Sequence, residues 1–520
     1  MNRKRETWGS RLGVILAVAG SAVGLGNFLR FPGQVAQNGG GAFMIPYFIS
    51  LFLLGIPLMW IEWTLGRFGG GFGHGTAPGI FHSVWNKNRF IKYFGVIGIF
   101  GPLVIFIYYT YIESWTLAYS FFALTGKYAN AANQTAMQDF LKAFQGLVRN
   151  EHFSGMKTAY AFFLITFILN AVVIYRGIKG GIEKLCNIAM PLIFIFGIIL
   201  MLRVLTLGAP DPVRPDWNIT NGLRFMWQPD FSVLKSAKVW LAAAGQIFFT
   251  LSVGIGVILT YASYLSKADD VVLSGLSAAG TNEFAEVILG GSIIIPAAFV
   301  FFGPQDIQGI AHSGMFNLGF VTMPLILMRF PLAAIFGFIW FFLLFLAGLT
   351  SSVSLAQPAV AFLEDEFNIS RKKALGIFVA ATFLLCQPAI FFLKNGIVDE
   401  LDFWGGTFFL VVFATVETIL FAWVFGMEKA WEETHRGAVW QVPKIYKFII
   451  KYITPLFLFF ILGSWLFQQW MPVIMMKDVA AENLPYILAT RLGLALLFVV
   501  LAILVKIVWR KKYHRDGRRR

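Results

Sequence analysis

Two long apolar segments of this chain are interrupted near their centres by closely spaced glycines. Residues 21–26 read SAVGLG and residues 251–256 read LSVGIG, so each segment carries Val-Gly-aliphatic-Gly. A backbone group left unpaired in lipid costs several kcal/mol, so an interrupted span needs a polar environment at that depth. Glycines that merely allow close helix packing are the alternative. Two interrupted spans in corresponding halves of a chain favour a solute and ion site at the membrane midplane.

The composition predicts a polytopic membrane protein. Of 520 residues, 58% are hydrophobic and 13% are charged, against about 25% charged in a soluble domain. The sequence therefore predicts an all-α membrane protein of about twelve helices, each near or above the ~20 residues that a bilayer requires. The apolar runs are 11–37, 41–66, 90–124, 159–175, 185–207, 238–266, 271–302, 332–362, 374–393, 403–425, 447–470 and 485–509. The gaps 126–157 and 208–236 are expected to be extramembrane loops.

Basic residues gather at both ends of the chain, whose net charge is +15. By the positive-inside rule both termini are cytoplasmic, which requires an even number of spans. A basic tail beside a last span, here 510–520, favours contact with anionic membrane lipid, and no module for binding nucleic acid accompanies it. Cys186 and Cys386 lie in or beside spans, with neither a disulfide framework nor metal-ligand spacing.

Polar side chains inside the predicted spans are costly and therefore indicate function. They are Asn27, Arg30, Glu62, Glu113, Asn282, Glu283, Glu286, Asp402 and Glu417. For Glu113 and Glu417, buried ion pairs that fix helix packing are an equal alternative. Asn27 and Asn282 have amide oxygens, which are good ligands for a hard cation.

Residues 347–352 read AGLTSS and add hydroxyls within the eighth span. Thr350 and Ser351 could form an oxygen cage with carbonyls freed at the first break, although small residues also serve as packing contacts. Uncharged oxygens suit Na⁺, whereas Mg²⁺ and Ca²⁺ prefer carboxylates and Zn²⁺ prefers nitrogen or sulfur. The half-helix after the first break offers N–H groups and a positive dipole end to a carboxylate. A zwitterion with an apolar tail fits, and Tyr109 could donate to its carboxylate.

With these motifs the chain closely resembles the neurotransmitter:sodium symporters, and among them the bacterial leucine-transporter branch. The resemblance covers essentially all spans. The matching motifs are RETW (5–8), GLGNFLRFP (24–32), NGGGAF (38–43), PLMWIE (57–62), YY (108–109), ESW (113–115), GQIFFTLS (245–252), AGLTSS (347–352) and DFW (402–404).

The resemblance implies one polytopic transporter domain, residues 1–520, built on an inverted repeat with helices 1 and 6 unwound. Helices 1–5 (11–207) form the first repeat and helices 6–10 (238–425) the second. Helices 11 and 12 (447–509) and a basic cytoplasmic tail (510–520) follow.

By resemblance the protein is a sodium-coupled symporter of small apolar amino acids that works by alternating access in a prokaryotic plasma membrane, and a homodimer is compatible with this. Two Na⁺ sites are implied. The first would use Ala22, Asn27, Thr250, Asn282 and the substrate carboxylate. The second would use Gly20, Val23, Ala347, Thr350 and Ser351.

The substrate pocket carried over from the family contains eleven positions. They are Ala22, Leu25, Gly26, Ile105, Tyr109, Phe249, Thr250, Ser252, Ile255, Ser351 and Leu355. Positions 105, 255 and 355 look like Val, Phe and Ile in the leucine-transporter branch, where this chain has Ile, Ile and Leu. Ile in place of Phe at 255 widens one wall of the pocket, and Ile in place of Val at 105 narrows another. Each methylene of fit is worth about 1–3 kcal/mol. Leucine or methionine is favoured, with alanine and aromatic amino acids left open.

The resemblance also implies two gates and an answer on chloride. Arg30 would pair with Asp402 over a lid of Tyr109 and Phe249. The inner gate residues are Arg5, Trp8, Tyr264 and Asp365. Glu286 stands where chloride-dependent relatives have a neutral Ser, so transport is expected to be chloride-independent, and Glu286 could take up a proton on the return step.

Three other functions compete with transport. A substrate-gated sensor would use the same site without net flux. An intramembrane enzyme needs a nucleophile–base pair or a metal cluster, but all six histidines fall in predicted loops or tails, so no enzyme is expected. An ion channel needs a continuous polar pore, which two gates around one site argue against.

Overall fold

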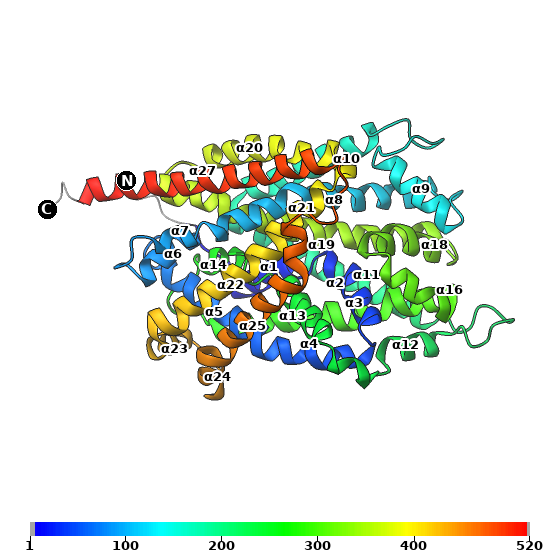
Figure 1. Ribbon diagram of the computed structural model, residues 1–520, viewed down its shortest axis with the longest axis horizontal. Helices are drawn as coiled ribbons and strands as arrows, with labels where there is room; N and C mark the ends of the chain where they lie inside the picture. Colours follow the sequence, from blue (N-terminus) through cyan, green and yellow to red (C-terminus); the bar gives the residue numbers. More distant parts are fainter. Residues whose placement is uncertain (1–5, 517–520) are drawn as a thin grey trace.

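The computed structural model describes residues 6–516, apart from the side chains of Gln308 and of residues 512–516. This part of the chain is helical, and its one β contact is an isolated antiparallel bridge between Gly40 and Pro229. Most helices run along the long axis of the molecule (Figure 1). Ten helices of the described part are long and apolar enough to span a membrane, or eleven with one bent pair. The predicted polytopic helical fold is confirmed.

The helices have the following bounds, where η denotes a 3₁₀ or π segment. The first part of the chain forms α1 (Arg11–Ala22), α2 (Leu25–Leu29), α3 (Phe31–Gln37), η1 (Gly41–Phe43), α4 (Met44–Ser50), η2 (Leu51–Gly55), α5 (Ile56–Gly70), α6 (Ala77–Val84), α7 (Ile91–Phe94), α8 (Ile97–Thr125), α9 (Gln134–Phe144), α10 (Lys157–Tyr175), η3 (Ile178–Glu183) and α11 (Lys184–Leu205).

The middle of the chain forms α12 (Ile219–Trp227), η4 (Phe231–Lys235), α13 (Ala237–Leu251), α14 (Val257–Ala262), α15 (Val271–Glu283), η5 (Phe284–Gly290), α16 (Gly291–His312), α17 (Met315–Asn317), η6 (Leu318–Thr322), α18 (Met323–Leu327), α19 (Ala333–Ala361) and η7 (Phe362–Glu366).

The last part forms α20 (Arg371–Phe391), η8 (Leu393–Asn395), α21 (Ile397–Asp402), η9 (Phe403–Phe408), α22 (Phe409–Ile419), η10 (Leu420–Gly426), α23 (Met427–His435), α24 (Ile445–Phe448), η11 (Ile449–Ile453), α25 (Thr454–Trp465), η12 (Leu466–Trp470), α26 (Met471–Ile474) and α27 (Leu484–Asp516).

The first predicted break lies between α1 and α2. The helix before the break and the α2–α3 segment after it are bent by 50°. Gly24 has an extended backbone (φ −117°, ψ −164°), and the side-chain oxygen of Asn27 accepts its N–H at 2.9 Å. A Cβ on Gly24 would lie 3.0 Å from the Ser351 hydroxyl and 3.2 Å from the Tyr109 hydroxyl. Glycine therefore lets two polar side chains approach the exposed backbone.

The second break is a non-helical stretch between α13 and α14. Ser252, Gly254 and Gly256 all have left-handed φ values, of 54°, 77° and 81°, which side-chain-bearing residues adopt rarely. A Cβ on Gly256 would lie 2.5 Å from the carbonyl oxygen of Gly98 in α8. Close packing as well as backbone conformation thus requires glycine here, and the expectation that helices 1 and 6 are unwound is confirmed.

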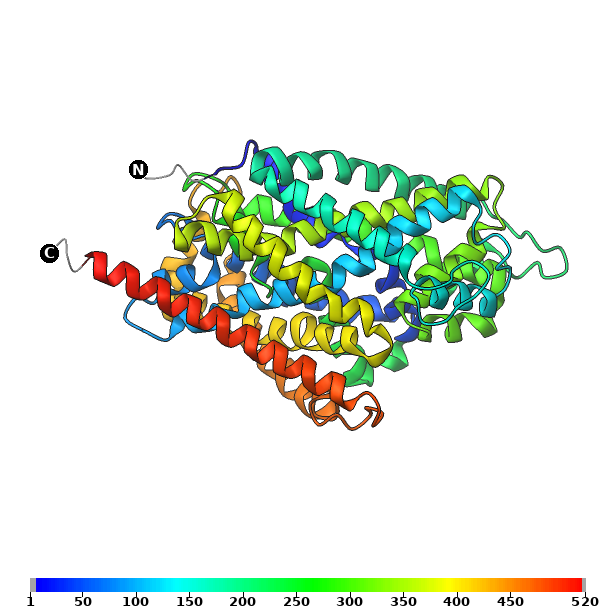
Figure 2. The same cartoon turned by 90° about the horizontal axis from the view of Figure 1, so that it is seen from above.

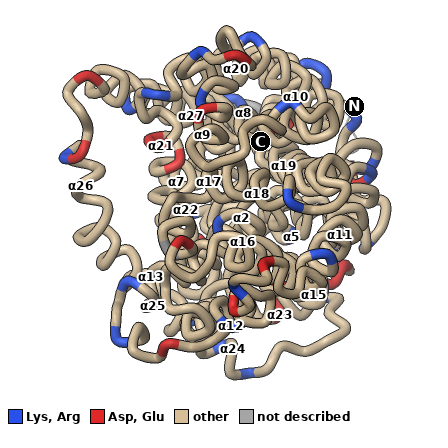
Figure 3. Tube along the Cα trace, turned by 90° about the vertical axis from the view of Figure 1, so that its right-hand side faces the viewer, with Lys and Arg blue, Asp and Glu red and all other residues tan. Residues whose placement is uncertain are grey.

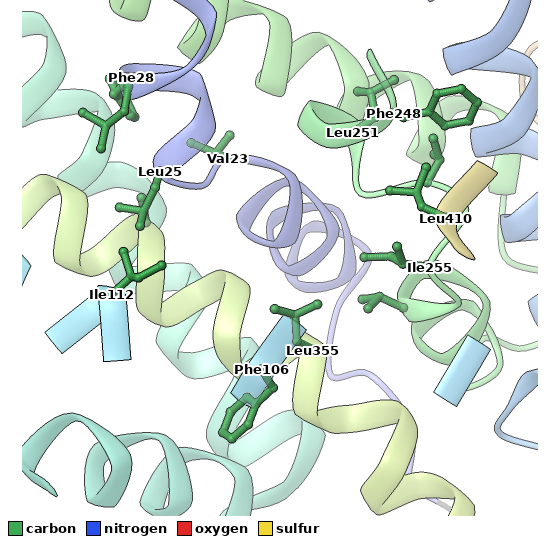
Figure 4. Packing of buried hydrophobic residues seen from close by; sticks show 14 of the residues in the cluster. Val23, Leu25, Phe28, Phe106, Ile112, Phe248, Leu251, Ile255, Leu355 and Leu410 are labelled. Carbon is green, nitrogen blue, oxygen red and sulfur yellow. The ribbon is translucent and has the colours of Figure 1, made fainter. Parts of the chain in front are cut away.

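The core forms around α8 and α19, two helices of 29 residues each that are buried over most of their length. These helices pack against each other, and α19 also contacts α1, α2 and α14. Figure 4 shows apolar side chains at both breaks, with Val23 and Leu25 on the left and Leu251 and Ile255 on the right. Leu355 of α19 lies below and between the two groups.

The periphery has the character of a lipid-facing surface. Large apolar side chains point outward, including Leu384, Leu456 and Leu492, each about two-thirds exposed or more (67–72%). The long helix α27 runs along the outer edge of the bundle in both views (Figures 1 and 2). Viewed from one end, most of the chain trace is uncharged (Figure 3). The first and last described residues lie at the same end of the molecule (Figures 1 and 2), as an even number of spans requires.

The extramembrane segments contain more helix than expected. The predicted loops 126–157 and 208–236 contain α9, α12 and η4. Residues 315–327 between the seventh and eighth runs form the apolar segment α17–η6–α18, which is too short to span a membrane. A kink at Gly303 (φ 78°, ψ 175°) turns the end of α16 before this segment. Periodicity alone missed these elements because they are short.

The close contact between α5 and α14 supplies a stability test. A Cβ on Gly66 would lie 2.4 Å from the carbonyl oxygen of Leu259 and 2.7 Å from Cβ of Ala262. We expect Gly66→Ala to destabilise the protein by about 1–3 kcal/mol through overpacking, measured as a lower thermal unfolding midpoint in detergent. Gly376→Ala is the matched control, because Gly376 is an exposed helical glycine with no atom near its added Cβ. Equal midpoints for the two variants would contradict the packing described.

Candidate functional site

A cavity of about 250 Å³ lies between the two helix breaks. Ten of the eleven predicted substrate residues line it: Ala22, Leu25, Gly26, Ile105, Tyr109, Phe249, Ser252, Ile255, Ser351 and Leu355. Thr250, the eleventh, is not part of the wall. Residues from distant parts of the sequence therefore form one small chamber.

The polar end of the cavity is the start of α2. The backbone N–H of Leu25 donates to the Tyr109 hydroxyl at 3.4 Å. Phe249 covers Gly26 so closely that a Cβ there would lie 2.3 Å from the ring. The opposite walls are the apolar side chains of Ile105 and Ile255. This arrangement offers donors to an anionic group at one end and an apolar surface to a tail at the other.

Three side chains of the first predicted cation site meet beside this polar end. The Asn27 amide nitrogen donates to Asn282 Oδ1 at 2.8 Å and to Thr250 Oγ1 at 3.1 Å, and the Asn282 amide nitrogen donates to Thr250 Oγ1 at 2.9 Å. All three residues are at most 1% exposed. Three spans thus bring two amide groups and a hydroxyl together, and the Glu286 carboxylate bonds to that hydroxyl. Amide and hydroxyl oxygens are ligands that fit Na⁺.

The second predicted cation site lies where α1 crosses α19. Ser351 Oγ approaches the carbonyl oxygens of Gly20 at 3.4 Å and Ser21 at 3.2 Å. A Cβ on Gly20 would lie 3.2 Å from Thr350 Cβ, so these two residues face each other. Thr350 Oγ1 lies 3.1 Å from the Ala347 carbonyl. Carbonyl oxygens of α1 and hydroxyl groups of α19 therefore lie close together here, and Val23 is the residue at which α1 ends.

Glu286 lies beside the first cation cluster, surrounded by donors. Gln246 Nε2 donates to it at 2.9 Å, the Tyr47 hydroxyl at 3.0 Å, and the Thr250 hydroxyl also donates to it. Tyr47 lies within 2.8 Å of a Glu283 oxygen as well. Three donors, from α4 and α13, therefore converge on the Glu286 carboxyl group. Because the Thr250 hydroxyl donates its hydrogen to Glu286, the lone pairs of the Thr250 oxygen face Asn27 and Asn282.

Arg30 and Phe249, two of the predicted outer gate residues, line both this cavity and a second hollow of about 360 Å³. The Arg30 guanidinium lies 4.6 Å from the centre of the Phe249 ring. Asp402 accepts the Tyr108 hydroxyl at 2.5 Å. Among the ion pairs within 4.0 Å in the described residues, Arg30–Asp402 does not occur, so the expected pair lines the entrance without closing it by direct contact.

The inner gate is described only in part, because Arg5 lies outside the described residues. The Trp8 indole N–H donates to the Tyr261 carbonyl at 3.0 Å, and the Tyr264 hydroxyl accepts from Gln357 at 2.9 Å. Asp365 lies in η7. Trp8 therefore contacts α14, and Tyr264 follows the end of that helix.

Arg371 joins this inner end to further polar groups that sequence reasoning missed. It donates to Glu364 at 2.9 Å and to Gln357 at 3.1 Å, and it approaches Glu6 at 3.9 Å. Its proximity to Gln357 comes from the turn after η7, which no local pattern in the sequence reveals.

Several cavity residues were also missed. They are Ser21, Gly24, Ile112, Phe248, Met315, Phe316, Val398, Asp399, Gly406, Thr407 and Leu410. Met315 and Phe316 belong to the short helix α17, which lacks a sequence signature of its own. Glu113 bonds to Asn170 at 3.2 Å and forms no ion pair among the described residues, so the packing ion pair considered for it is absent there.

Comparison with known proteins agrees with this geometry. The model of the sodium:neurotransmitter symporter family matches residues 5–139 and 128–513. The uncharacterized sodium-dependent transporter MJ1319 of Methanocaldococcus jannaschii is 33% identical over 462 residues, covering 88% of this chain and 89% of that protein. Sodium-dependent nutrient amino acid transporter 1 of Drosophila persimilis is 27% identical over 507 residues, covering 87% and 74%.

A solved structure shares the fold. The crystal structure of MhsT in complex with L-phenylalanine has a TM-score of 0.75 and 32% sequence identity, and covers 89% of this chain and 100% of that chain. Since the family model spans nearly the whole sequence and both helix breaks are present, the chain belongs to the sodium:neurotransmitter symporter family, a family of integral membrane transporters.

Proposed function

We propose that this protein is a symporter that couples the uptake of one amino acid to the entry of two Na⁺ ions, in the plasma membrane of a prokaryote with both termini in the cytoplasm. The observation that carries the proposal is the cavity between the two helix breaks, which has a cluster of uncharged oxygens on either side. The sodium-dependent relatives support the use of Na⁺.

The substrate carboxylate would lie at the start of α2, near the backbone N–H groups of Leu25 and Gly26 and the Tyr109 hydroxyl. Asn27 is in the same helical turn, and it contacts Thr250 and Asn282. A Na⁺ bound by Ala22, Asn27, Thr250 and Asn282 would therefore be adjacent to the substrate carboxylate. Direct contact between opposite charges in a dry site stabilises both strongly, so ion and substrate would bind together.

The second Na⁺, bound by Gly20, Val23, Ala347, Thr350 and Ser351, would have another role. It would join α1 to α19, and so hold the first break against the central helix. Bound Na⁺ would thereby favour one conformation of the broken helices over the other. An ion can shift such an equilibrium only through its difference in affinity for the two states.

Alternating access would move the broken helices relative to the rest of the bundle. The two repeats, 11–207 and 238–425, each begin with a broken helix. Arg30 and Phe249 line the cavity and would form the outer gate, and Trp8 and Tyr264 would belong to the inner gate. A symporter opens one end at a time, whereas a sensor of the same fold would bind substrate without net flux.

Leucine and methionine are the substrates that the cavity favours. Its tail region is lined by Ile105, Ile255 and Leu355, which suit an unbranched or γ-branched aliphatic chain. An aromatic amino acid is the second candidate, supported by the phenylalanine bound to MhsT and by the wall that Ile255 leaves open. Each methylene of misfit costs about 1–3 kcal/mol, so both classes stay within reach of small changes.

The carboxylate of Glu286 would make transport independent of chloride. It already occupies the position between Tyr47, Gln246 and Thr250 that a bound anion would need. A fixed negative charge there balances Na⁺ without a second ion. On the return step, when Na⁺ has left, this carboxylate would take up a proton.

Sodium dependence of binding is the first test. Radiolabelled leucine should bind the purified protein in Na⁺ and fail to bind in K⁺. Thr350→Val should raise the Na⁺ concentration for half-maximal binding on the order of tenfold, because one oxygen ligand is lost. Asn27→Asp should weaken leucine binding even at saturating Na⁺, because its carboxylate would repel that of the substrate.

Thr382→Val is the matched control for Thr350→Val, since the Thr382 hydroxyl bonds to the Phe378 carbonyl in its own helix. It should leave the Na⁺ requirement unchanged. Leucine binding that is equally strong in K⁺ would remove the coupled-symport proposal.

Competition among amino acids tests the substrate. Leucine should displace the radiolabel at lower concentration than phenylalanine does. Ile255→Phe narrows the cavity and should reduce phenylalanine binding on the order of tenfold relative to leucine, while alanine binding shows that the variant is folded. Stronger binding of phenylalanine than of leucine by the unmodified protein would favour the aromatic reading instead.

Chloride dependence tests Glu286. Glu286→Ser removes the fixed charge, so uptake into liposomes should become stimulated by chloride over gluconate, whereas the unmodified protein should respond equally to both anions. Glu283→Ser is the control, because Glu283 shares Tyr47 but does not accept from Thr250 or Gln246. Chloride-independent uptake by Glu286→Ser would count against the assigned role.

A further inference from the structure

A pair of buried glutamates lies behind the second helix break. Glu62 on α5 and Glu417 on α22 are both 0% exposed. One carboxyl oxygen of Glu62 accepts the backbone N–H of Gly254 at 2.5 Å. The same carboxyl group faces the backbone N–H of Leu259, in the first turn of α14. Glu62 therefore contacts backbone N–H groups within the non-helical stretch and at the start of α14.

The carboxyl groups of Glu62 and Glu417 contact each other. Apart from that contact, both oxygens of Glu417 and Oε2 of Glu62 lack a hydrogen-bond partner within the described chain. Between residues 6 and 516, neither carboxyl forms an ion pair with Lys, Arg or His. The titratable group that faces each of these glutamates is thus the other glutamate.

Two ionised carboxylates in contact repel each other strongly where water is excluded. A shared proton turns this repulsion into a short, charge-assisted O–H···O bond, as in dyads where two carboxylates hold one proton. A metal ion would need further oxygen ligands. In the described residues no group of three or more Asp, Glu, His or Cys is placed to hold one. A proton is therefore the ligand that fits.

The glutamate pair links the break of helix 6, to which Glu62 bonds, with α22, which carries Glu417. A Cβ on Gly254 would lie 2.8 Å from the Leu410 carbonyl oxygen and 3.1 Å from Ala414 Cβ, so α22 packs directly on the break. Leu410, Ala414 and Glu417 follow at helical spacing on one face of α22. Leu410 also lines the cavity. A force between Glu62 and Glu417 would thus act on the cavity wall.

We propose that Glu62 and Glu417 form a proton-binding site, separate from the sodium sites, that holds one shared proton while α22 packs on the break of helix 6. Release of this proton to water leaves two carboxylates in contact, and their repulsion drives α22 away from the break. The site makes the shape of the substrate cavity dependent on pH. Only its binding readout rests on the proposed function.

Infrared difference spectroscopy of the purified protein tests for the proton directly. The unmodified protein at neutral pH should show the carbonyl-stretch band of a protonated buried carboxyl group. Glu417→Gln and Glu62→Gln should each remove the same band component, because either change leaves a single carboxylate bonded to an amide N–H. Glu113→Gln is the control, because Glu113 contacts Asn170 rather than a second carboxyl, and it should leave that component in place. A spectrum unchanged by both pair variants would overturn the proposal.

The pH dependence of amino-acid binding tests the consequence. In saturating Na⁺, leucine affinity of the unmodified protein should fall on the order of tenfold as the pH rises from about 6 to about 9. Leucine affinity falls because the proton shared by Glu62 and Glu417 favours packing of α22 on the break, and this proton is lost at high pH. Glu417→Gln should keep its affinity over that range, since its amide donates permanently to Glu62. A parallel fall in leucine affinity in both proteins would overturn the proposal. If leucine does not bind at any pH, the proposed function is contradicted, and the infrared test still decides whether the proton site exists.

Discussion

The rest of this structure depends on how backbone polar groups are satisfied where two membrane helices unwind. A free N–H or C=O in the hydrocarbon region is too costly to leave unpaired. Asn27 accepts the N–H of Gly24 at the first break, and Glu62 accepts that of Gly254 at the second. Ser252 donates to the Ser21 carbonyl at 2.9 Å, so the two breaks bond to each other. The unwound segments are stabilised by side chains from several helices.

Because those side chains come from different helices, the proposed ion site includes residues of the broken helices themselves. Asn27 follows the first break, Thr250 precedes the second, and Asn282 is on a third helix. An ion bound among them would connect three elements at once. Binding energy can therefore act on the arrangement of helices, which is what coupling requires.

Buried carboxyl groups have different neighbours in different parts of the molecule, and those neighbours decide their chemistry. Glu286 is surrounded by hydroxyl and amide donors beside the proposed cation site. Glu113 meets an amide. Glu417 meets another carboxyl group, where one proton is needed to avoid repulsion. From the sequence all three are a Glu within an apolar run, and ion pairing for packing was an equal interpretation of Glu113 and Glu417.

The sequence by itself determined the membrane fold and both helix breaks, because lipid imposes long apolar runs and glycine is required where the backbone departs from a helix. The likeness of its motifs to the symporter family added ten of the residues that line the cavity. Local motifs could not show that Met315 and Phe316 reach the cavity, that Arg371 contacts Gln357, or that Glu62 and Glu417 touch. Those facts depend on contacts between segments far apart in the chain. Only the packing of the helices in three dimensions decides which buried polar groups become partners.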